Sequence, residues 1–312
     1  MKVIVAGAGV LGAEIGWRAA SDGHTVTLVD PAPGGLASPG SFAWLNASAA
    51  EDPVYNRLRH DSLQLWAALK DADPGVPVGF PGAILWEQEH FDIDAIARSH
   101  ADLKRPVEML DSGAIAEREP AVADLPGRAL LAAADGFGDP EAITGWFLSQ
   151  AQAHGASVVA ETITGIAVSN GCVTGVRTVS GPIEADHLVL AIGTALPKLL
   201  ALVGQDIEMD NQPGLLAKTS PGDGDIDAML ATPNVHIWRR EDGGYLVGAD
   251  FGGGGTVEDA GAIASSVLQD QKTVIAGTDA CAVTDVTVRE RPMPADGRPA
   301  IGPLGPSELY SI

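Results

Sequence analysis

The sequence predicts an α/β protein of two domains, a Rossmann-like dinucleotide-binding domain and a second α+β domain built on a largely antiparallel sheet. Three observations support this fold class. The chain opens with an apolar strand, a glycine-rich turn and a helix over residues 2–20. Further short apolar runs, typical of strands buried in a sheet, follow predicted helices that begin at Asp-Pro and end at Gly. Beyond about residue 206, short strands with alternating polar and apolar residues take over.

Composition narrows the classes of function. The chain has 312 residues, 46% of them hydrophobic, and a formal net charge of −22. Nucleic-acid backbones require a basic surface, so we expect no nucleic-acid partner and no anionic membrane surface. The two cysteines and seven histidines lack metal-ligand spacing, and we expect no metal. Because no signal peptide or membrane-spanning apolar run is seen, we expect a cytoplasmic protein.

The glycine-rich turn reads G-x-G-x-x-G and lies between the first strand and its helix. In this context Gly7 permits a tight turn, Gly9 lets the backbone approach a pyrophosphate, and Gly12 lets helix and strand pack closely. The helix begins at Val10 and Leu11, where free N–H groups and the positive end of the helix dipole favour phosphate. These five residues are the predicted phosphate-binding site of a dinucleotide.

A second strand over residues 25–29 ends at Asp30, about twenty residues beyond the glycines. A carboxylate at this position accepts hydrogen bonds from ribose hydroxyls and disfavours a 2′-phosphate, which argues against NADP. The fingerprint predicts a dinucleotide but does not distinguish NAD from FAD.

Residues 31–50 are rich in Gly, Pro, Ser and Ala and are expected to form a loop. A helix from Asp52-Pro53 to about Lys70 follows, with Val54, Leu58, Leu65 and Leu69 on one of its faces. Asn170-Gly171 predicts a hairpin turn, residues 183–193 a buried strand, and Gly252–Gly255 a loop or tight turn.

Four segments together resemble the D-amino-acid oxidase-like superfamily of flavoenzymes, which includes glycine and sarcosine oxidases. They are VIVAGAGVLGAEIGWRAASDGHTVTLVD (3–30), LASPGSFAWLNAS (36–48), residues 135–199 from DGFGDPEAITGWF to AIGTALPKL, and RERPMPADGRPAIGPLG (289–305). The resemblance implies FAD as the cofactor, and oxidation of a small amine or amino acid by hydride transfer from the amine-bearing carbon to the flavin. It calls for no catalytic side chain.

The resemblance also implies further site residues. Ser38 and Ser41 are expected to contact the cofactor from the loop, and Thr164 and Gly193 through the backbone. Arg291, in the R-P-x-x-x-D-G-x-P segment, is expected to bind a substrate carboxylate, because a guanidinium matches a carboxylate in shape and charge. Tyr245 is the second candidate for the substrate site, because it and Trp238 lie on strands that could cover the site. Packing in the core is the alternative role for both.

The implied domain organisation is discontinuous. Residues 1–75, 140–205 and 290–312 are expected to form the FAD-binding domain, and residues 76–139 and 206–289 the substrate domain. The sequence stops before a C-terminal segment that relatives are expected to carry. Two alternatives therefore stay open beside the flavoenzyme: an NAD-dependent dehydrogenase, and a truncated flavin-binding subunit without activity of its own. Both the flavoenzyme and the truncated flavin-binding subunit are compatible with a partner chain or a homo-oligomer.

Overall fold

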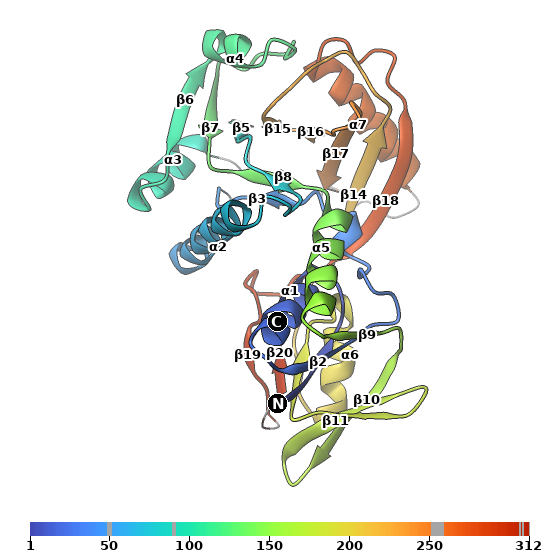
Figure 1. Cartoon of the computed structure of the whole chain (residues 1–312). Coiled ribbons are helices and arrows are strands. Elements are labelled where there is room, and N and C mark those ends of the chain that lie inside the picture. The colour runs from blue at the N-terminus through green and yellow to red at the C-terminus, as the bar shows by residue number, and fades with distance from the viewer. Residues whose placement is uncertain (49–51, 89–91, 251–258, 306, 308, 312) are drawn as a thin grey trace. The chain divides into compact units, whose positions relative to one another are not determined.

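The computed structural model describes residues 1–48, 52–88, 92–250, 259–305, 307 and 309–311 (Figure 1). The predicted turn at Gly252–Gly255 lies outside these residues. The chain divides into two compact units. Unit 1 comprises residues 1–41, 140–212 and 289–312, and unit 2 comprises residues 42–139 and 213–288.

Unit 1 is built on a six-stranded sheet in the order β19-β20-β13-β1-β2-β9. All neighbouring strands in it are parallel except β19 and β20. The predicted β-α-β unit is confirmed as β1 (Lys2–Ala6), α1 (Val10–Ser21) and β2 (Thr25–Val29). The other elements of the unit are η1 (Ser38–Gly40), α5 (Pro140–Ala153), β9 (Ser157–Val159), β10 (Ile163–Ser169), β11 (Cys172–Thr178), β12 (Pro182–Glu184), β13 (His187–Leu190), η2 (Gly193–Ala195), α6 (Leu196–Leu200), η3 (Ala201–Val203), β19 (Gly302–Pro303) and β20 (Leu309–Ser311).

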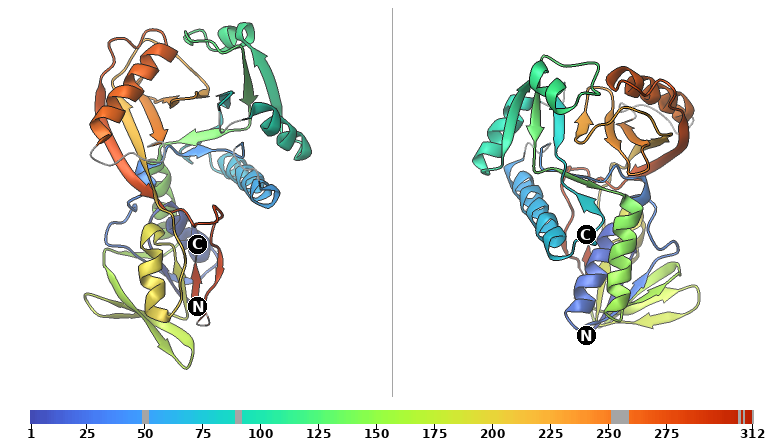
Figure 2. Two further views of the ribbon diagram at one scale, coloured as in Figure 1. Left: turned by 180° about the vertical axis from the view of Figure 1, so that it is seen from behind. Right: turned by 45° about the horizontal axis from the view of Figure 1, so that its top comes forward.

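Each face of this sheet has its own core. On one face α1 and α5 lie side by side (Figures 1 and 2), and Trp17 of α1 contacts Trp146 and Phe147 of α5 at centroid distances of 5.2 and 5.6 Å. The opposite face is covered by α6 and by the antiparallel sheet β10-β11-β12. The predicted hairpin is confirmed, since Asn170 and Gly171 both take positive φ between β10 and β11.

The predicted strand over 183–193 is interrupted. Its first part is β12, which belongs to the small sheet, and its second part is β13, which belongs to the large one. Asp186 lies between them, and its carboxylate and its amide both bond to the backbone of Lys2. The chain therefore changes sheets at Asp186, where a single continuous strand was expected.

Unit 2 contains an eight-stranded sheet in the order β18-β14-β17-β16-β15-β5-β7-β6, together with a small sheet β3-β8-β4. Most described pairings are antiparallel, and β15 with β5 is parallel. The fold class predicted from the sequence is thereby confirmed. The elements are β3 (Trp44–Leu45), α2 (Pro53–Ala72), β4 (Val78–Gly79), β5 (Ala83–Trp86), α3 (Ile93–Asp102), β6 (Val107–Asp111), α4 (Ser112–Arg118), β7 (Arg128–Ala132), β8 (Gly136–Gly138), β14 (Gln212–Thr219), β15 (Met229–Ala231), β16 (His236–Arg239), β17 (Tyr245–Asp250), α7 (Ala260–Val274) and β18 (Val283–Arg291).

Residues along β5 show how this sheet separates two cores. Ile84 and Trp86 point into the core that includes α7, whereas Ala83 and Leu85 point into the core that includes α3. This alternation is the two-residue period of a strand buried on both faces.

Residues 42–75 belong to unit 2, which corrects the predicted domain boundary. Within them, β3 pairs with β8. Helix α2 is tied to the same unit by hydrogen bonds from Asn56 to Ser99 of α3 and from Arg59 to Asn46. The first segment of unit 1 therefore ends at Ser41.

The apolar stripe predicted on α2 does not face the core. Val54, Leu58 and Leu65 are exposed, at 77%, 44% and 68% of their surface, whereas the buried residues of the helix are Asn56, His60 and Leu63. The side turned inward is thus partly polar, because it supplies hydrogen bonds to its neighbours.

Unit 2 also encloses an ion pair. Arg105 Nη2 lies 3.0 Å from Asp135 Oδ1, and both side chains are almost fully buried. A buried pair is costly to disrupt, because removing one partner leaves the other charge uncompensated in a medium of low polarity.

Two leucines of α2 test the orientation of that helix. Leu63→Ala removes buried side-chain atoms and should lower the free energy of unfolding by about 2–5 kcal/mol. Leu65→Ala alters an exposed side chain on the same helix and should change the free energy of unfolding by less than about 0.5 kcal/mol. Urea denaturation of both variants measures the difference, and equal effects would contradict the orientation described.

The ion pair is tested by Asp135→Asn. This change should destabilise the protein by about 3–5 kcal/mol in urea denaturation, because Arg105 keeps its buried charge without a counter-ion. Asp94→Asn, which breaks an exposed pair with Arg128, is the control and should have little effect. If the single variant does not fold, Asp135→Asn combined with Arg105→Met should restore folding. Equal stability of Asp135→Asn and Asp94→Asn would contradict the prediction.

Candidate nucleotide and substrate sites

The glycine turn of unit 1 has no room for side chains at two positions. Gly7 has a φ of +98°, donates its N–H to Val29 O at 2.9 Å, and a Cβ there would lie 2.1 Å from Ala191 O. A Cβ on Gly12 would lie 2.0 Å from Gly7 O. The turn therefore needs glycine at both positions, for the backbone conformation at the first and for helix–strand packing at the second.

Helix α1 begins with open N–H groups. Its N-cap is Gly9, which offers no side-chain cap. Val10 N–H donates to Ser38 Oγ at 3.0 Å, but no described residue accepts a hydrogen bond from the N–H of Leu11 or Gly12. Donors of this kind at a helix N-terminus match the oxygens of a pyrophosphate.

Asp30 holds the turn in place. Its Oδ2 accepts the N–H of Ala8 at 2.7 Å, and its Oδ1 accepts the N–H of Ala32 at 2.8 Å. The side chain stays partly exposed, and a carboxylate has about four acceptor sites. Asp30 thus has a structural role that the sequence analysis missed, and it retains capacity for the ribose contact that we still propose.

The loop after β2 folds back over the turn. A Cβ on Gly35 would lie 2.7 Å from Gly9 Cα, so the loop and the turn meet backbone to backbone. Ser38 reaches the helix N-terminus from this loop, whereas Ser41 is exposed and ends η1, where its N–H donates to Ser38 O. Arg289 Nε donates to Leu36 O at 3.1 Å, which joins the 289–305 segment to the same loop.

Gly193 lies at a second turn in unit 1. It follows β13 with a φ of +56°, and a Cβ there would lie 3.8 Å from Pro292. Arg291, the neighbour of Pro292, is exposed at the end of β18. Thr164 is exposed at a β-bulge, where Ile163 and Gly165 pair with β11 but Thr164 itself does not. The cofactor contacts of Thr164 and Gly193 and the substrate contact of Arg291 remain proposals.

Tyr245 is not available to a substrate, which corrects the sequence-based assignment. Its side chain is fully buried in the core of unit 2 that includes α7, and its hydroxyl donates to Gly224 O. Burial raises the pKa of this phenol above its usual value. Alternation along β17 placed Tyr245 on a sheet face but could not indicate that α7 covers that face.

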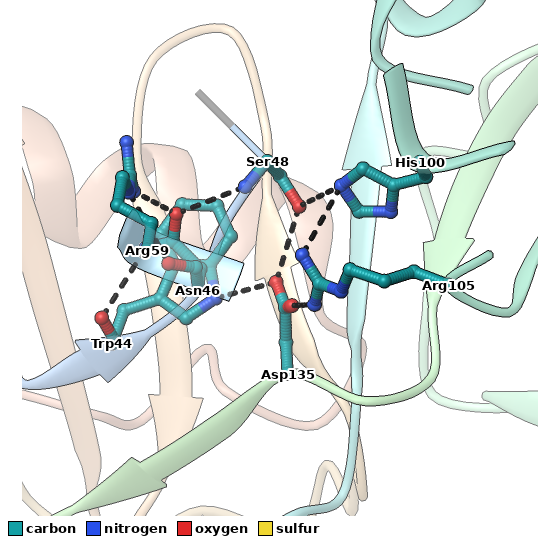
Figure 3. A network of polar contacts seen from close by, with 7 residues as sticks. All are labelled: Trp44, Asn46, Ser48, Arg59, His100, Arg105 and Asp135. Carbon is teal, nitrogen blue, oxygen red and sulfur yellow. Dashed lines mark hydrogen bonds and ion pairs between the residues drawn. The ribbon is translucent and has the colours of Figure 1, made fainter. Parts of the chain in front are cut away.

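A polar network in unit 2 surrounds the buried ion pair (Figure 3). Asp135 Oδ2 accepts hydrogen bonds from Trp44 Nε1 at 3.0 Å and from Ser48 Oγ at 3.4 Å. Ser48 Oγ also lies 3.4 Å from His100 Nε2. These contacts fix the short segment that contains β3. The sequence analysis missed them, although the Asp-Gly pair at 135–136 and Trp44 both lie in segments that carried the family resemblance.

Protonation in this network follows from burial. Burial raises the pKa of Asp135 to about 6, although Arg105 and the hydrogen bonds oppose that shift. Burial and the nearby Arg105 charge lower the pKa of His100 to about 4. At neutral pH the network therefore contains an ionised carboxylate paired to Arg105 and a neutral imidazole.

The described residues include no group of three or more His, Cys, Asp or Glu side chains arranged to hold a metal ion. Among the helices described, none is long and apolar enough to cross a membrane.

Comparisons with known proteins agree with this architecture. In sequence, the chain is 27% identical over 268 residues to D-amino acid dehydrogenase of Rhodopseudomonas palustris (strain HaA2), across 66% of this chain and 63% of that protein. The structure is similar to L-amino acid deaminase from Proteus vulgaris with its specific insertion deleted, with a TM-score of 0.88, 16% identity and coverage of 99% of this chain and 83% of the other.

It is also similar to glycine oxidase from Geobacillus kaustophilus, with a TM-score of 0.86, 20% identity and coverage of 99% and 87%. These two likenesses concern the fold. A family model described as FAD dependent oxidoreductase matches residues 2–311, nearly the whole chain. The open helix N-terminus, the glycine turn and Asp30 fit the nucleotide part of that cofactor, and the chain belongs to the FAD-dependent oxidoreductase family.

Proposed function

We propose that this protein binds FAD in unit 1 and oxidises a small amine or amino acid. The observation that carries the proposal is the N-terminus of α1, where no described residue accepts the N–H of Leu11 or Gly12 and where the Asp30 carboxylate holds the preceding turn through the N–H of Ala8. The family match over residues 2–311 and the amino-acid substrates named for the relatives support it.

The chain's own residues have defined tasks in this proposal. The N-terminus of α1 and Ser38 hold the phosphates, Asp30 holds the ribose, and the turn at Gly193 lets the backbone approach the cofactor. FAD, when bound, supplies the two-electron acceptor for the hydride of the amine-bearing carbon. Arg291 binds the substrate carboxylate and thereby orients that carbon.

Cofactor binding is tested first. The full chain, purified and supplemented with FAD, should retain flavin after gel filtration and show its visible absorption bands. Gly12→Val should abolish retention, because its side chain collides with Gly7 O at the phosphate site. Gly145→Ala in α5 meets nothing within 4 Å and is the control. Circular dichroism establishes that each variant is folded, and Arg291→Met should keep its flavin. Binding of NADH with no affinity for FAD would favour an NAD-dependent dehydrogenase instead.

Arg291→Met tests the substrate site. The change should raise KM for amino acids at least about tenfold, because a guanidinium–carboxylate pair is lost. It should leave KM for amines without a carboxylate unchanged. Arg298→Met, in the same segment, is the control for altered surface charge. Steady-state assays, with oxygen or an artificial electron acceptor, measure KM for amino acids and KM for amines without a carboxylate. Equal effects of the two variants would remove Arg291 from the site. Flavin binding without turnover on any amine would identify a flavin-binding subunit.

A further inference from the structure

A cluster of aromatic rings lies on the face of the large unit 2 sheet opposite α7. Neighbouring rings in it have centroids 5.5 to 6.3 Å apart. Aromatic residues make up only 5% of the chain, so this concentration is unusual. The aromatic cluster consists of Phe42, Trp44, Phe137, His236 and Trp238.

Most of the aromatic cluster is only partly covered. Phe137 is fully buried, whereas the other four residues of the cluster are only partly buried. Rings in a closed core lose nearly all of their exposed surface, while rings that line a binding site keep a free part for the ligand.

The orientation of these rings is set in advance. The indole N–H of Trp44 is held by the buried carboxylate of Asp135 at 3.0 Å. The ring of Phe42 lies against Gly248 of β17, where a Cβ would lie only 2.9 Å from the ring. Rings fixed in this way lose little entropy when a ligand covers them.

Arg59 borders the aromatic cluster and has a charge without a counter-ion. Its Nε donates to Asn46 O at 3.3 Å and its Nη2 to Asn46 Oδ1. Asn46 in turn donates to Trp44 O at 3.2 Å, which links Arg59 to the main chain of Trp44 in the cluster. Figure 3 shows a terminal nitrogen of Arg59 pointing away from these acceptors.

The contacts of Arg59 are all neutral. Among the described residues, no carboxylate lies within ion-pair distance of its guanidinium, and a guanidinium has five N–H donors. The chain has 41 acidic and 19 basic residues, yet this partly buried arginine contacts two oxygens of Asn46 and the ring of Tyr55, whose centroid lies 5.6 Å from Arg59 Cζ. Burial lowers the pKa of Arg59, although the nearby Tyr55 and Asp135 oppose that shift, and a bound anion would favour the charged form further.

We propose that Arg59 and the aromatic cluster bind a carboxylate that carries a bulky apolar group. This proposal rests on the proposed function. It names amino acids with aromatic or large aliphatic side chains as the substrate class. Arg59 would bind the carboxylate, while Trp44, Trp238 and Phe42 would cover the side chain. The Arg59 variants described here and the Arg291 variants described above test the two arginines separately.

Calorimetric titration of the full chain with non-reacting probes tests the proposal. Phenylacetate should bind at least about tenfold more tightly than acetate. Arg59→Met should weaken phenylacetate at least about tenfold and leave its neutral analogue phenylacetamide unchanged. Trp238→Leu should lower the ratio of phenylacetate to acetate affinity without changing acetate binding.

Arg57→Met is the matched control, because Arg57 lies on the same helix and pairs with Asp61 at the surface. If Arg59→Met does not fold, Arg59→Lys should retain charge but weaken phenylacetate, while phenylacetamide again stays unchanged. The proposal is overturned if the wild-type chain does not prefer phenylacetate, if Arg59→Met behaves like Arg57→Met, or if Trp238→Leu and Phe42→Leu leave the ratio unchanged.

Because these titrations involve no turnover, they are independent of the proposed oxidation. Probe binding that depends on Arg59, without oxidation of any amine, would support the recognition site and contradict the proposed function. Oxidation of amines, together with probe binding that does not depend on Arg59, would support the proposed function and contradict the recognition site.

Discussion

The close approach of backbone to backbone around Gly7 is the constraint on which the nucleotide site depends. Ala191 O occupies the space of a side chain at Gly7, and Gly7 O occupies that space at Gly12. Strand β1, strand β13 and helix α1 can meet at this point only because both residues lack a Cβ. The result is a helix in which no described residue accepts the N–H of Leu11 or Gly12, and which follows a turn held by the partly exposed Asp30 carboxylate. In a chain with a net charge of −22, such fixed local donors matter more for binding phosphate than overall charge.

Unit 2 depends on a different constraint, the burial of charge. Asp135 is satisfied by Arg105, Trp44 and Ser48, which joins three separate segments of the chain. A buried polar network contributes little net energy when complete, but it excludes other arrangements because each incomplete one leaves a buried group unpaired. This network therefore defines where the indole of Trp44 lies, and with it one side of the aromatic cluster.

The two units thus offer different kinds of binding groups. In unit 1, backbone groups and a carboxylate suit a nucleotide that carries phosphates and ribose. In unit 2, a guanidinium without a counter-ion borders partly exposed rings, which suits a small molecule with a carboxylate and an apolar side chain. Membership in the FAD-dependent oxidoreductase family supports the cofactor. Under our proposals, unit 1 would hold that cofactor and contribute Arg291, and unit 2 would contribute Arg59 and the aromatic cluster.

The sequence by itself determined the β-α-β unit, the need for glycine at Gly7 and Gly12, and the Asn170-Gly171 hairpin, because each depends on residues close together along the chain. It also determined the family, through motifs in four segments. It placed Val54, Leu58 and Leu65 on one helix face, yet the structure turns Asn56 and His60 inward. It also placed Tyr245 at a substrate site that the structure fills with core. Periodicity shows which residues share a face but not what covers that face. Only the tertiary structure brought Arg105 to Asp135 and Arg59 to Asn46. Burying these charged groups is unfavourable, so such contacts form only where the other interactions of the folded chain offset that free energy.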